Sequence, residues 1–344
     1  RPVASLLRNG YEGDVYPINS RSDNIQGLQS YGSILDVPKD VDLAICAVPD
    51  AAVKTVLTEC AQKGVKSVIV FSSGFAEVSE TGAKAQAEIA GLTREAGMRM
   101  MGPNCMGMVN FANKAVASFH PAFGEDLVAG RIGLVSQSGA FGGLSYVLAR
   151  ERRQSLSYML TTGNEADVDI GDCTAFLAED PNTDVILLYM EGCRDGAKFV
   201  EALERARANN KPVVAVKLGR TEAGAAAAAS HTAALAGEDA IYASIFRQFG
   251  VYRASSIEEF FDIGRACVIG QLPRNDRVGL VTVSGGVGVL MADDAHDRQL
   301  DVAEMPADAQ AQMREMVPFA GPRNPIDVTG QILNDSSLLG RTMS

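Results

Sequence analysis

Three glycine–serine turns are the first residues of this sequence whose types and spacing could do chemistry. FSSGF (71–75), SQSGA (136–140) and TVSGGVG (282–288) each follow an apolar run. Where a strand passes into a helix at such a turn, backbone N–H groups and the helix dipole favour an anion. A purely structural tight turn also needs small residues, so one turn alone leaves both interpretations open. Three turns in one chain predict at least one anion-binding site.

A single histidine could carry chemistry at such a site. His231 lies in the run AAAASHTAALAG, whose small side chains leave the imidazole room to meet a large ligand. Histidine titrates near neutral pH, so a catalytic role is one interpretation and a structural role is the other. The two remaining histidines, His120 in a loop and His296 in a charged helical segment, are interpreted as structural or exposed.

Carboxylate and amide side chains follow two further apolar runs. Glu191 ends VILLYMEG, where a carboxylate would point into the ligand crevice of a parallel sheet or would cap the next helix. Asn164 and Glu165 in TTGNEADVD carry the same two interpretations. In MGPNCMGMVN (101–110), Pro103 restricts the chain and the glycines permit close approach of a ligand, but an ordinary closing loop has the same composition.

The elements that must position these residues alternate between apolar runs and helical patterns. Continuous Val, Ile and Leu strands followed by amphipathic helices predict the α/β class, with parallel sheets covered on both faces. The predicted strand–helix pairs are VDLAICAVP with 50–63, SVIVFSSGF with 80–96, RIGLVSQSG with 141–153, VILLYMEG with 196–209, PVVAVKLG with 238–249 and RVGLVTVSGG with 289–300.

Two segments divide the chain into three α/β units, the first of them rich in glycine and polar residues. They are HPAFGEDLVAG (120–130) and QLPRNDR (271–277). LVSQSGAFGGL (134–144) and LVTVSGGVGVL (280–290) share one pattern and predict that the second and third units are similar domains. The chain begins in a helix-like segment, without the strand and glycine turn that open a nucleotide-binding unit, and ends shortly after the third unit begins. We therefore expect a portion of a longer protein.

Composition argues against several classes of function. A net charge of −11 disfavours nucleic acid as a partner. The six cysteines form no CxxC pair, so we expect no metal site or disulfide framework and favour a reducing cytoplasm. No apolar stretch approaches the roughly 18–20 residues of a membrane span, so a soluble protein without a membrane partner is expected.

Read together, the segments resemble NDP-forming (ADP-forming) acyl-CoA synthetases, relatives of the succinyl-CoA synthetase α subunit. The resemblance covers essentially the whole chain, and its most specific parts are the order of the segments and SHTAALAG, in which Ala233 replaces an expected glycine. The segments are GPNCMG, LVSQSGA, TGNEADVD, DPNTDVILLYMEG, KPVVAVKLGRTEAG, SHTAALAG and NPIDVTG (324–330). The implied fold is a Rossmann-like CoA-binding domain (1–125), a flavodoxin-like domain carrying the phosphohistidine (126–272) and the start of a second flavodoxin-like domain (273–344).

The resemblance also implies a reaction, an acid–CoA ligation. Acid, CoA and ATP are interconverted with acyl-CoA, ADP and phosphate through an acyl phosphate and a phosphohistidine. The implied phosphohistidine is His231, and the carboxylate that orients it is Glu191. The residues implied to bind the phosphoryl group are Ser138, Gly139 and Ala140. The implied CoA contacts are Val48, Pro49, Ser72, Ser73, Gly74, Asn104 and Cys105.

These implied roles agree with the chemistry of the side chains. A neutral imidazole accepts a phosphoryl group, a carboxylate on its other nitrogen stabilises the developing positive charge, and a helix N-terminus stabilises the anion. ATP or ADP with Mg²⁺ is expected on ATP-grasp domains outside this chain, within an oligomer. The identity of the acid and of the nucleotide base stays open.

Two other classes of function are alternatives to the ligase. One is a non-catalytic CoA- or nucleotide-sensing module fused to a protein acetyltransferase, which the presence of His231 disfavours. The other is a NAD-dependent dehydrogenase, which the lack of a GxGxxG fingerprint with a downstream acidic partner disfavours.

Overall fold

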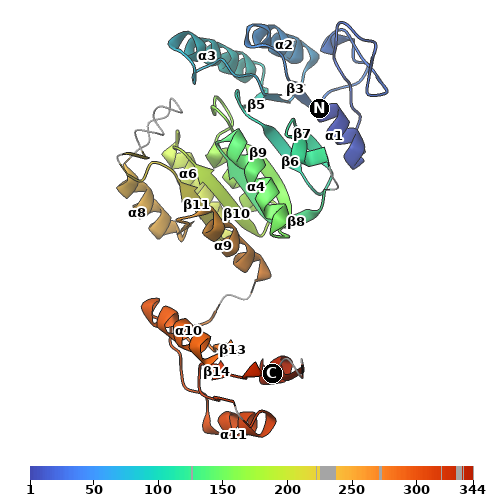
Figure 1. The fold of residues 1–344 in the computed structure, drawn as a ribbon. Coiled ribbons are helices and arrows are strands. Elements are labelled where there is room, and N and C mark those ends of the chain that lie inside the picture. The colour runs from blue at the N-terminus through green and yellow to red at the C-terminus, as the bar shows by residue number, and fades with distance from the viewer. Residues whose placement is uncertain are drawn as a thin grey trace. The chain divides into compact units, whose positions relative to one another are not determined.

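The computed structural model divides the chain into two compact units, Arg1–Gly270 and Gln271–Ser344 (Figure 1). The structure describes residues 1–124, 127–221, 223–224, 238–270, 273–318, 320–330, 335 and 337–343. Among the helices of these ranges, none combines the length and the apolar character that crossing a bilayer would require.

The first unit opens with a small parallel sheet of order β3-β4-β5. Two helices pack on it through buried aliphatic side chains such as Val53, Leu57 and Ile89, which meet Val68 and Val70 of the sheet. These elements are β3 (Leu43–Cys46), α2 (Asp50–Lys63), β4 (Ser67–Val70), α3 (Glu80–Glu95) and β5 (Arg99–Met101); α1 (Pro2–Asn9), β1 (Asn24–Ile25), β2 (Leu28–Gln29) and η1 (Ile34–Asp36) precede them.

A seven-stranded sheet of order β12-β11-β10-β8-β9-β6-β7 forms the centre of this unit. Its strands are β6 (Gly107–Asn110), β7 (Ala115–Ser118), β8 (Ala129–Ser136), β9 (Leu156–Thr161), β10 (Val185–Met190), β11 (Val213–Lys217) and β12 (Tyr252–Arg253). The five strands from β12 to β9 are parallel, whereas β6 and β7 form an antiparallel hairpin at one edge. The sequence predicted parallel strands only, so the antiparallel hairpin differs from that prediction.

The hairpin depends on Gly107, a residue for which the sequence predicted only close approach of a ligand. Gly107 has a φ of +92°, and a Cβ atom there would lie 2.0 Å from the carbonyl oxygen of Ala117 on the neighbouring strand. Any larger residue would therefore push the two strands apart. The second half of MGPNCMGMVN is thus a strand, and its first half is the loop that approaches the site described below.

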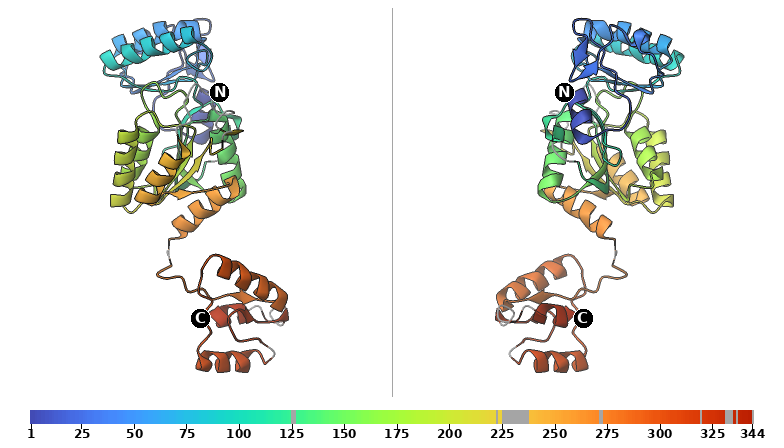
Figure 2. Two further views of the ribbon diagram at one scale, coloured as in Figure 1. Left: turned by 90° about the vertical axis from the view of Figure 1, so that its left-hand side faces the viewer. Right: turned by 90° about the vertical axis from the view of Figure 1, so that its right-hand side faces the viewer.

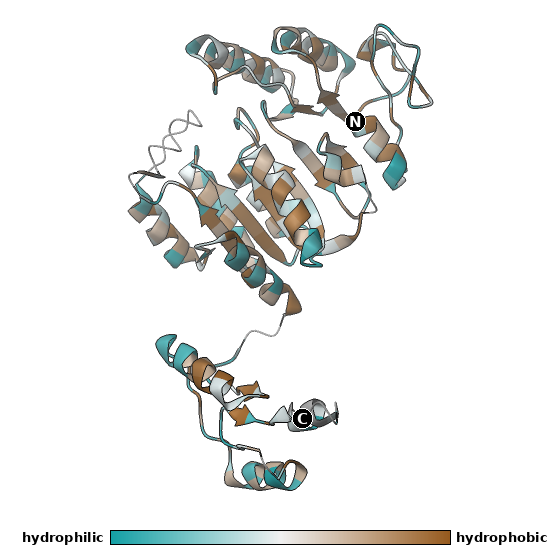
Figure 3. Ribbon diagram, viewed as in Figure 1, coloured by the Kyte–Doolittle hydropathy of each residue, from teal (hydrophilic) through white to brown (hydrophobic). Residues whose placement is uncertain are grey.

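Helices cover both faces of the central sheet, as the sequence predicted (Figures 1 and 2). Along β10, Leu187 packs with Tyr146 and Phe260 on one face, while Ile186 and Leu188 pack on the other. Burial on both faces explains why the strand reads as a continuous apolar run, which Figure 3 shows in its hydropathy colours. The helices are α4 (Gly139–Glu151), α5 (Ile170–Glu179), α6 (Gly196–Ala208), α8 (Asp239–Phe249) and α9 (Ile257–Ile269), with the short η2 (Pro121–Gly124) before β8.

The second unit contains a short parallel pair of strands, β13 (Val281–Thr282) and β14 (Ile326–Asp327). The helix α10 (Gly285–Asp297) begins four residues before the predicted 289, because the glycines after N-cap Ser284 belong to its first turn. Ser138 is likewise the N-cap of α4, which agrees with the repeat seen in the sequence. The other helices of the second unit are α11 (Ala307–Met316) and α12 (Ser337–Met343).

Candidate functional site

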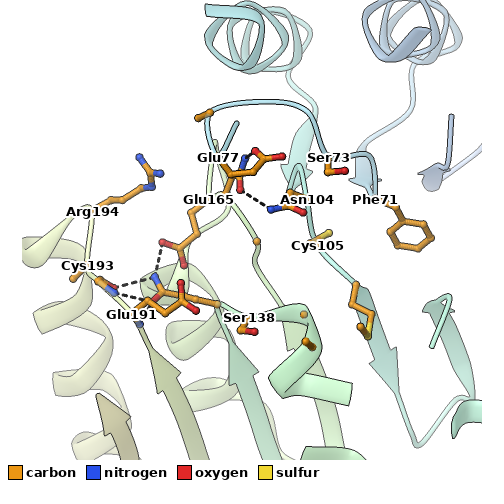
Figure 4. A pocket seen from close by; sticks show the side chains of 18 of the residues that line it. Phe71, Ser73, Glu77, Asn104, Cys105, Ser138, Glu165, Glu191, Cys193 and Arg194 are labelled. Carbon is orange, nitrogen blue, oxygen red and sulfur yellow. Dashed lines mark hydrogen bonds between the residues drawn. The ribbon is translucent and has the colours of Figure 1, made fainter. Parts of the chain in front are cut away.

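A cavity of about 780 Å³ opens in the first unit where several strands end. Ligands of doubly wound folds bind at this edge, outside the carboxyl ends of parallel strands. Phe71 follows β4, Gly163 follows β9, and Asn104 belongs to the loop after β5. Segments far apart in the sequence therefore meet around one space, which Figure 4 shows from close by. The full lining is Phe71, Ser73, Ala76, Glu77, Asn104–Met106, Phe119, Gln137–Ala140, Gly163–Glu165 and Glu191–Arg194.

The N-terminus of α4 forms one wall of this cavity. Ser138, Gly139 and Ala140 all line it, and Ser138 Oγ accepts a hydrogen bond from the backbone N–H of Phe141 at 3.2 Å. A Cβ atom on Gly139 would lie 3.1 Å from Cβ of Met106, so this turn has little room for a side chain. The first-turn N–H groups and the positive end of the helix dipole make this wall suited to an anion.

Glu191 lies beside this helix end, immediately after β10. Figure 4 shows Glu191 and Ser138 on one side of the cavity and Glu77 and Ser73 on the other. The backbone carbonyl of Glu191 accepts a hydrogen bond from Lys217 Nζ at 2.9 Å. The alternative interpretation, that Glu191 caps the next helix, is wrong, because Asp195 is the N-cap of α6.

The loop after β9 of the central sheet is hydrogen-bonded to the segments that follow β4 and β5 of the small parallel sheet. Asn164 Nδ2 donates to Glu77 Oε2 at 2.5 Å and to Gln86 Oε1 at 2.9 Å, while Asn164 Oδ1 accepts from Asn104 Nδ2 at 3.2 Å. Burial opposes ionisation of Glu77, but hydrogen bonds from Asn164 and from the glycine turn lower its pKa. Sequence reasoning missed Glu77, because its role depends on a contact 87 residues away.

Glu165 is the most deeply buried carboxylate of the cavity, with 5% of its surface exposed. Its Oε1 accepts from Thr162 Oγ1 at 2.8 Å and from the backbone N–H of Ile170 at 3.0 Å, and its Oε2 accepts from Gln137 Nε2 at 2.9 Å. Burial raises its pKa to about 7. Both interpretations left open by the sequence therefore hold, since Glu165 binds the first turn of α5 and also lines the cavity.

The residues implied as CoA contacts divide between two adjoining spaces. Ser73, Asn104 and Cys105 line the large cavity, whereas Val48, Pro49, Ser72 and Ser73 line a second hollow of about 570 Å³. Phe71, Ser73 and Phe119 line both.

Several of the implied CoA contacts have polar atoms that are bonded within the chain. Ser72 Oγ donates to the carbonyl of Val48 at 2.5 Å, and Cys105 Sγ donates to the carbonyl of Val70 at 3.4 Å. Gly74 lines neither space, and its N–H donates to Glu77 Oε1 at 2.7 Å. Burial raises the pKa of the Cys105 thiol to about 12, so that thiol stays protonated. Arg1, the N-terminus of α2 and the carboxylate of Asp50 border the smaller hollow, so a phosphate-bearing ligand there would meet two positive groups and one negative group.

His231 lies outside the described residues. The part of the chain that contains it connects β11, the neighbour of β10 in the sheet, to α8. Within the described ranges, no group of three or more His, Cys, Asp or Glu side chains is arranged to hold a metal ion.

Most of the chain matches known protein families. Residues 1–110 match a CoA binding domain, residues 129–267 match a succinyl-CoA ligase like flavodoxin domain, and residues 278–336 match a ligase-CoA domain. These matches confirm the CoA-binding domain and the succinyl-CoA ligase-like flavodoxin domain that the resemblance implied.

Individual relatives extend over nearly the whole chain. The α subunit of ADP-forming acetate–CoA ligase I from Pyrococcus furiosus is 40% identical over 95% of this chain and 71% of its own length. ADP-forming 4-hydroxybutyrate–CoA ligase from Nitrosopumilus maritimus is 34% identical over 95% of this chain and 47% of its own length. Dinucleotide-forming acetyl-coenzyme A synthetase 1 from Ca. Korarchaeum cryptofilum, solved with phosphate and ADP, superimposes with a TM-score of 0.89 at 37% identity, covering 96% of this chain and 70% of that one. The alternative, a sensing module fused to an acetyltransferase, is not supported by these similarities.

Proposed function

We propose, from the premise that this chain belongs to the NDP-forming (ADP-forming) acyl-CoA synthetase family and is an acid–CoA ligase, that its large cavity is the acyl-transfer site. In this proposal residues 1–125 bind CoA, residues 126–272 carry the phosphohistidine, and residues 273–344 begin a second flavodoxin-like domain. CoA and a nucleotide are co-substrates of the family's reaction.

In one direction the reaction starts from acyl-CoA and phosphate. A phosphate oxygen attacks the thioester carbonyl, the carbon–sulfur bond breaks, and the CoA sulfur leaves as a thiolate that takes up a proton. A ring nitrogen of His231 then attacks phosphorus, and the phosphorus–oxygen bond to the acyl group breaks, which releases the carboxylate. ADP finally accepts the phosphoryl group from His231.

One observation carries this proposal: the cavity brings the N-terminus of α4 together with Glu191 and the loops assigned to CoA. The helix end would stabilise the charge of the phosphoryl group during both transfers. Glu191 would hold the proton on the far nitrogen of His231 and stabilise the imidazolium that forms. Glu191 follows β10, the neighbour of β11 in the sheet, and α4 follows β8 on the other side of β10; His231 comes after β11 in the chain.

The direct test is incubation of this chain with an acyl-CoA and radiolabelled phosphate. We expect a label on His231 that survives alkali and is lost in acid, as a phosphoramidate requires. CoA without an acyl group is the control and should give no label. A chain that binds acyl-CoA yet stays unlabelled would contradict the proposal.

The charges around the cavity favour a monocarboxylic acid as substrate. Its described lining includes Glu77, Glu165 and Glu191, and Arg194 is the only cation of that lining. The part of the sequence from 225 to 237 contains no Lys or Arg either. A second carboxylate on the substrate would therefore meet three carboxylates and a single cation, Arg194.

We expect phosphate-dependent cleavage of acetyl-CoA or butyryl-CoA to exceed that of succinyl-CoA by about 10²-fold in kcat/KM. Free CoA release, followed with a thiol reagent, measures all three substrates under one condition. Equal kcat/KM values for succinyl-CoA and butyryl-CoA would show that the carboxylates do not select the substrate. The named acids of the two ligase relatives, acetate and 4-hydroxybutyrate, are monocarboxylic.

The nucleotide site is proposed to lie on ATP-grasp domains, with Mg²⁺ bound there. The Pyrococcus furiosus relative is an α subunit, which supports assembly of this chain with a second subunit or with further domains of a longer protein. The six cysteines are free thiols, which supports a cytoplasmic location.

A further inference from the structure

Gln137, the residue between β8 and the first turn of α4, makes four hydrogen bonds with its side-chain amide. Nε2 donates to Glu165 Oε2 and to the backbone carbonyl of Gly192, both at 2.9 Å. Oε1 accepts from the backbone N–H of Glu191 at 2.5 Å and of Gly192 at 3.0 Å. A primary amide has two donors and two acceptor positions, so every one of them is used. Figure 4 draws these bonds between Glu165 and the chain at Glu191.

These bonds continue the pairing of β8 with β10 beyond the point where the strands end. The parallel register ends with Tyr189 opposite Ser136, and the backbone N–H of Gln137 donates to the carbonyl of Tyr189 at 3.2 Å. Past that point the Gln137 side chain replaces the neighbouring backbone as partner of the peptides at Glu191 and Gly192. Since Gly192 is buried, its N–H group would be costly to leave without a partner.

Glu165 determines which way the amide faces. With its Oε2 as acceptor, Nε2 must point toward Glu165 and Oε1 toward the two backbone N–H groups. A flipped amide would place oxygen against carboxylate and N–H against N–H. The other titratable or charged groups that act on Glu165 are Asp169, Cys173, Cys193, Arg194 and Tyr242.

We infer that Gln137 is a positioning residue that acts through Glu191, holding the end of β10 so that this carboxylate meets the imidazole of His231. The inference rests on the role proposed for Glu191. Lys217, bonded to the carbonyl of Glu191, holds the same peptide from the side of β11. The backbone of Glu191 is thus held from both neighbouring strands, which limits where its side chain can reach.

Two substitutions test this inference in different ways. Gln137→Leu removes all four bonds, and we expect kcat to fall about 10²-fold because a catalytic group misplaced by about 1 Å loses that much. KM for acyl-CoA should stay within about twofold, since no implied CoA contact bonds to Gln137. Faster hydrogen exchange of the amides at 191 and 192 is expected as well.

Gln137→Glu provides a pH readout that a merely structural residue would not give. One oxygen of the new carboxyl can still accept from Glu191 and Gly192, but the other meets Glu165 and the carbonyl of Gly192. The carboxyl at position 137 and that of Glu165 are tolerated side by side while they share one proton. Activity should therefore be present at low pH and lost as pH rises through neutrality. The wild type, with an amide donor there, should not show this falling limb.

A buried glutamine elsewhere provides the matched control. Gln154, after α4, donates to the carbonyl of Phe261 and lines no cavity described above. Gln154→Leu should match the wild type in kcat, pH profile and exchange at 191 and 192.

Wild-type rates, pH profile and amide exchange in both Gln137 variants would overturn the inference. Faster exchange at 191 and 192 without any loss of kcat would overturn it too, because Glu191 would then act without being held. Failure of the proposed function is recognised separately, as an unlabelled His231 in the wild type.

Discussion

Replacing His231 with alanine is expected to abolish ATP formation from acyl-CoA, ADP and phosphate, with a loss of about 10⁴-fold or more. The imidazole is the proposed covalent carrier, and no other route takes the phosphoryl group from the acyl phosphate to ADP. The preceding step, attack of phosphate on the thioester, does not use His231. We therefore expect His231→Ala to release CoA and to accumulate acyl phosphate.

Two measurements separate these steps. A coupled assay with the ATP-grasp partner reports ATP, and trapping with hydroxylamine reports acyl phosphate. His296→Ala, which changes an exposed histidine of α10 in the second unit, is the control and should retain both activities. ATP formation by His231→Ala at more than about a hundredth of the wild-type rate would contradict the role of His231.

Replacing Glu191 with glutamine is expected to slow phosphorylation of His231 by about 10²- to 10⁴-fold, the range typical for loss of a group that assists proton transfer or orients a histidine. Glutamine keeps the shape of the side chain but lacks the charge that stabilises the imidazolium. The contacts of Glu191 with Gln137 and Lys217 use its backbone, so the substitution should leave the end of β10 in place.

Rapid-quench measurement of a single turnover isolates this step from product release. Glu201→Gln, on the exposed face of α6 where Glu201 pairs with Arg205, is the matched control and should change nothing. Wild-type rates of phosphorylation in Glu191→Gln would remove Glu191 from the mechanism. A rise in KM for acyl-CoA at unchanged kcat would show that Glu191 contributes to acyl-CoA binding and not to phosphorylation.

Local sequence patterns predicted a large part of the fold. The α/β class and the strand–helix order follow from continuous apolar runs such as that of β10, because a strand covered by helices on both faces has no polar side to display. The position of Glu191 follows from the same rule, since the residue after such a run lies at the carboxyl end of the sheet.

The hairpin β6–β7 could not be predicted in this way. Its strands have four residues each, which is too short for a periodic pattern to identify them. They are strands because β6 pairs with β9, a contact that joins Gly107 to Thr161. Pairing between residues this far apart leaves no periodic signal in either segment.

The sequence by itself determined the layers of the first unit and the turns at the ends of its strands, and it is the sole source of the prediction that His231 carries the chemistry. These properties depend on side chains within a few positions of one another, and they can be read locally. Only the tertiary structure decided that Glu77, Gln137 and Glu165 belong to the same cavity as Glu191. Their roles come from hydrogen bonds that span 28 to 87 residues, and such bonds exist only after the chain has folded.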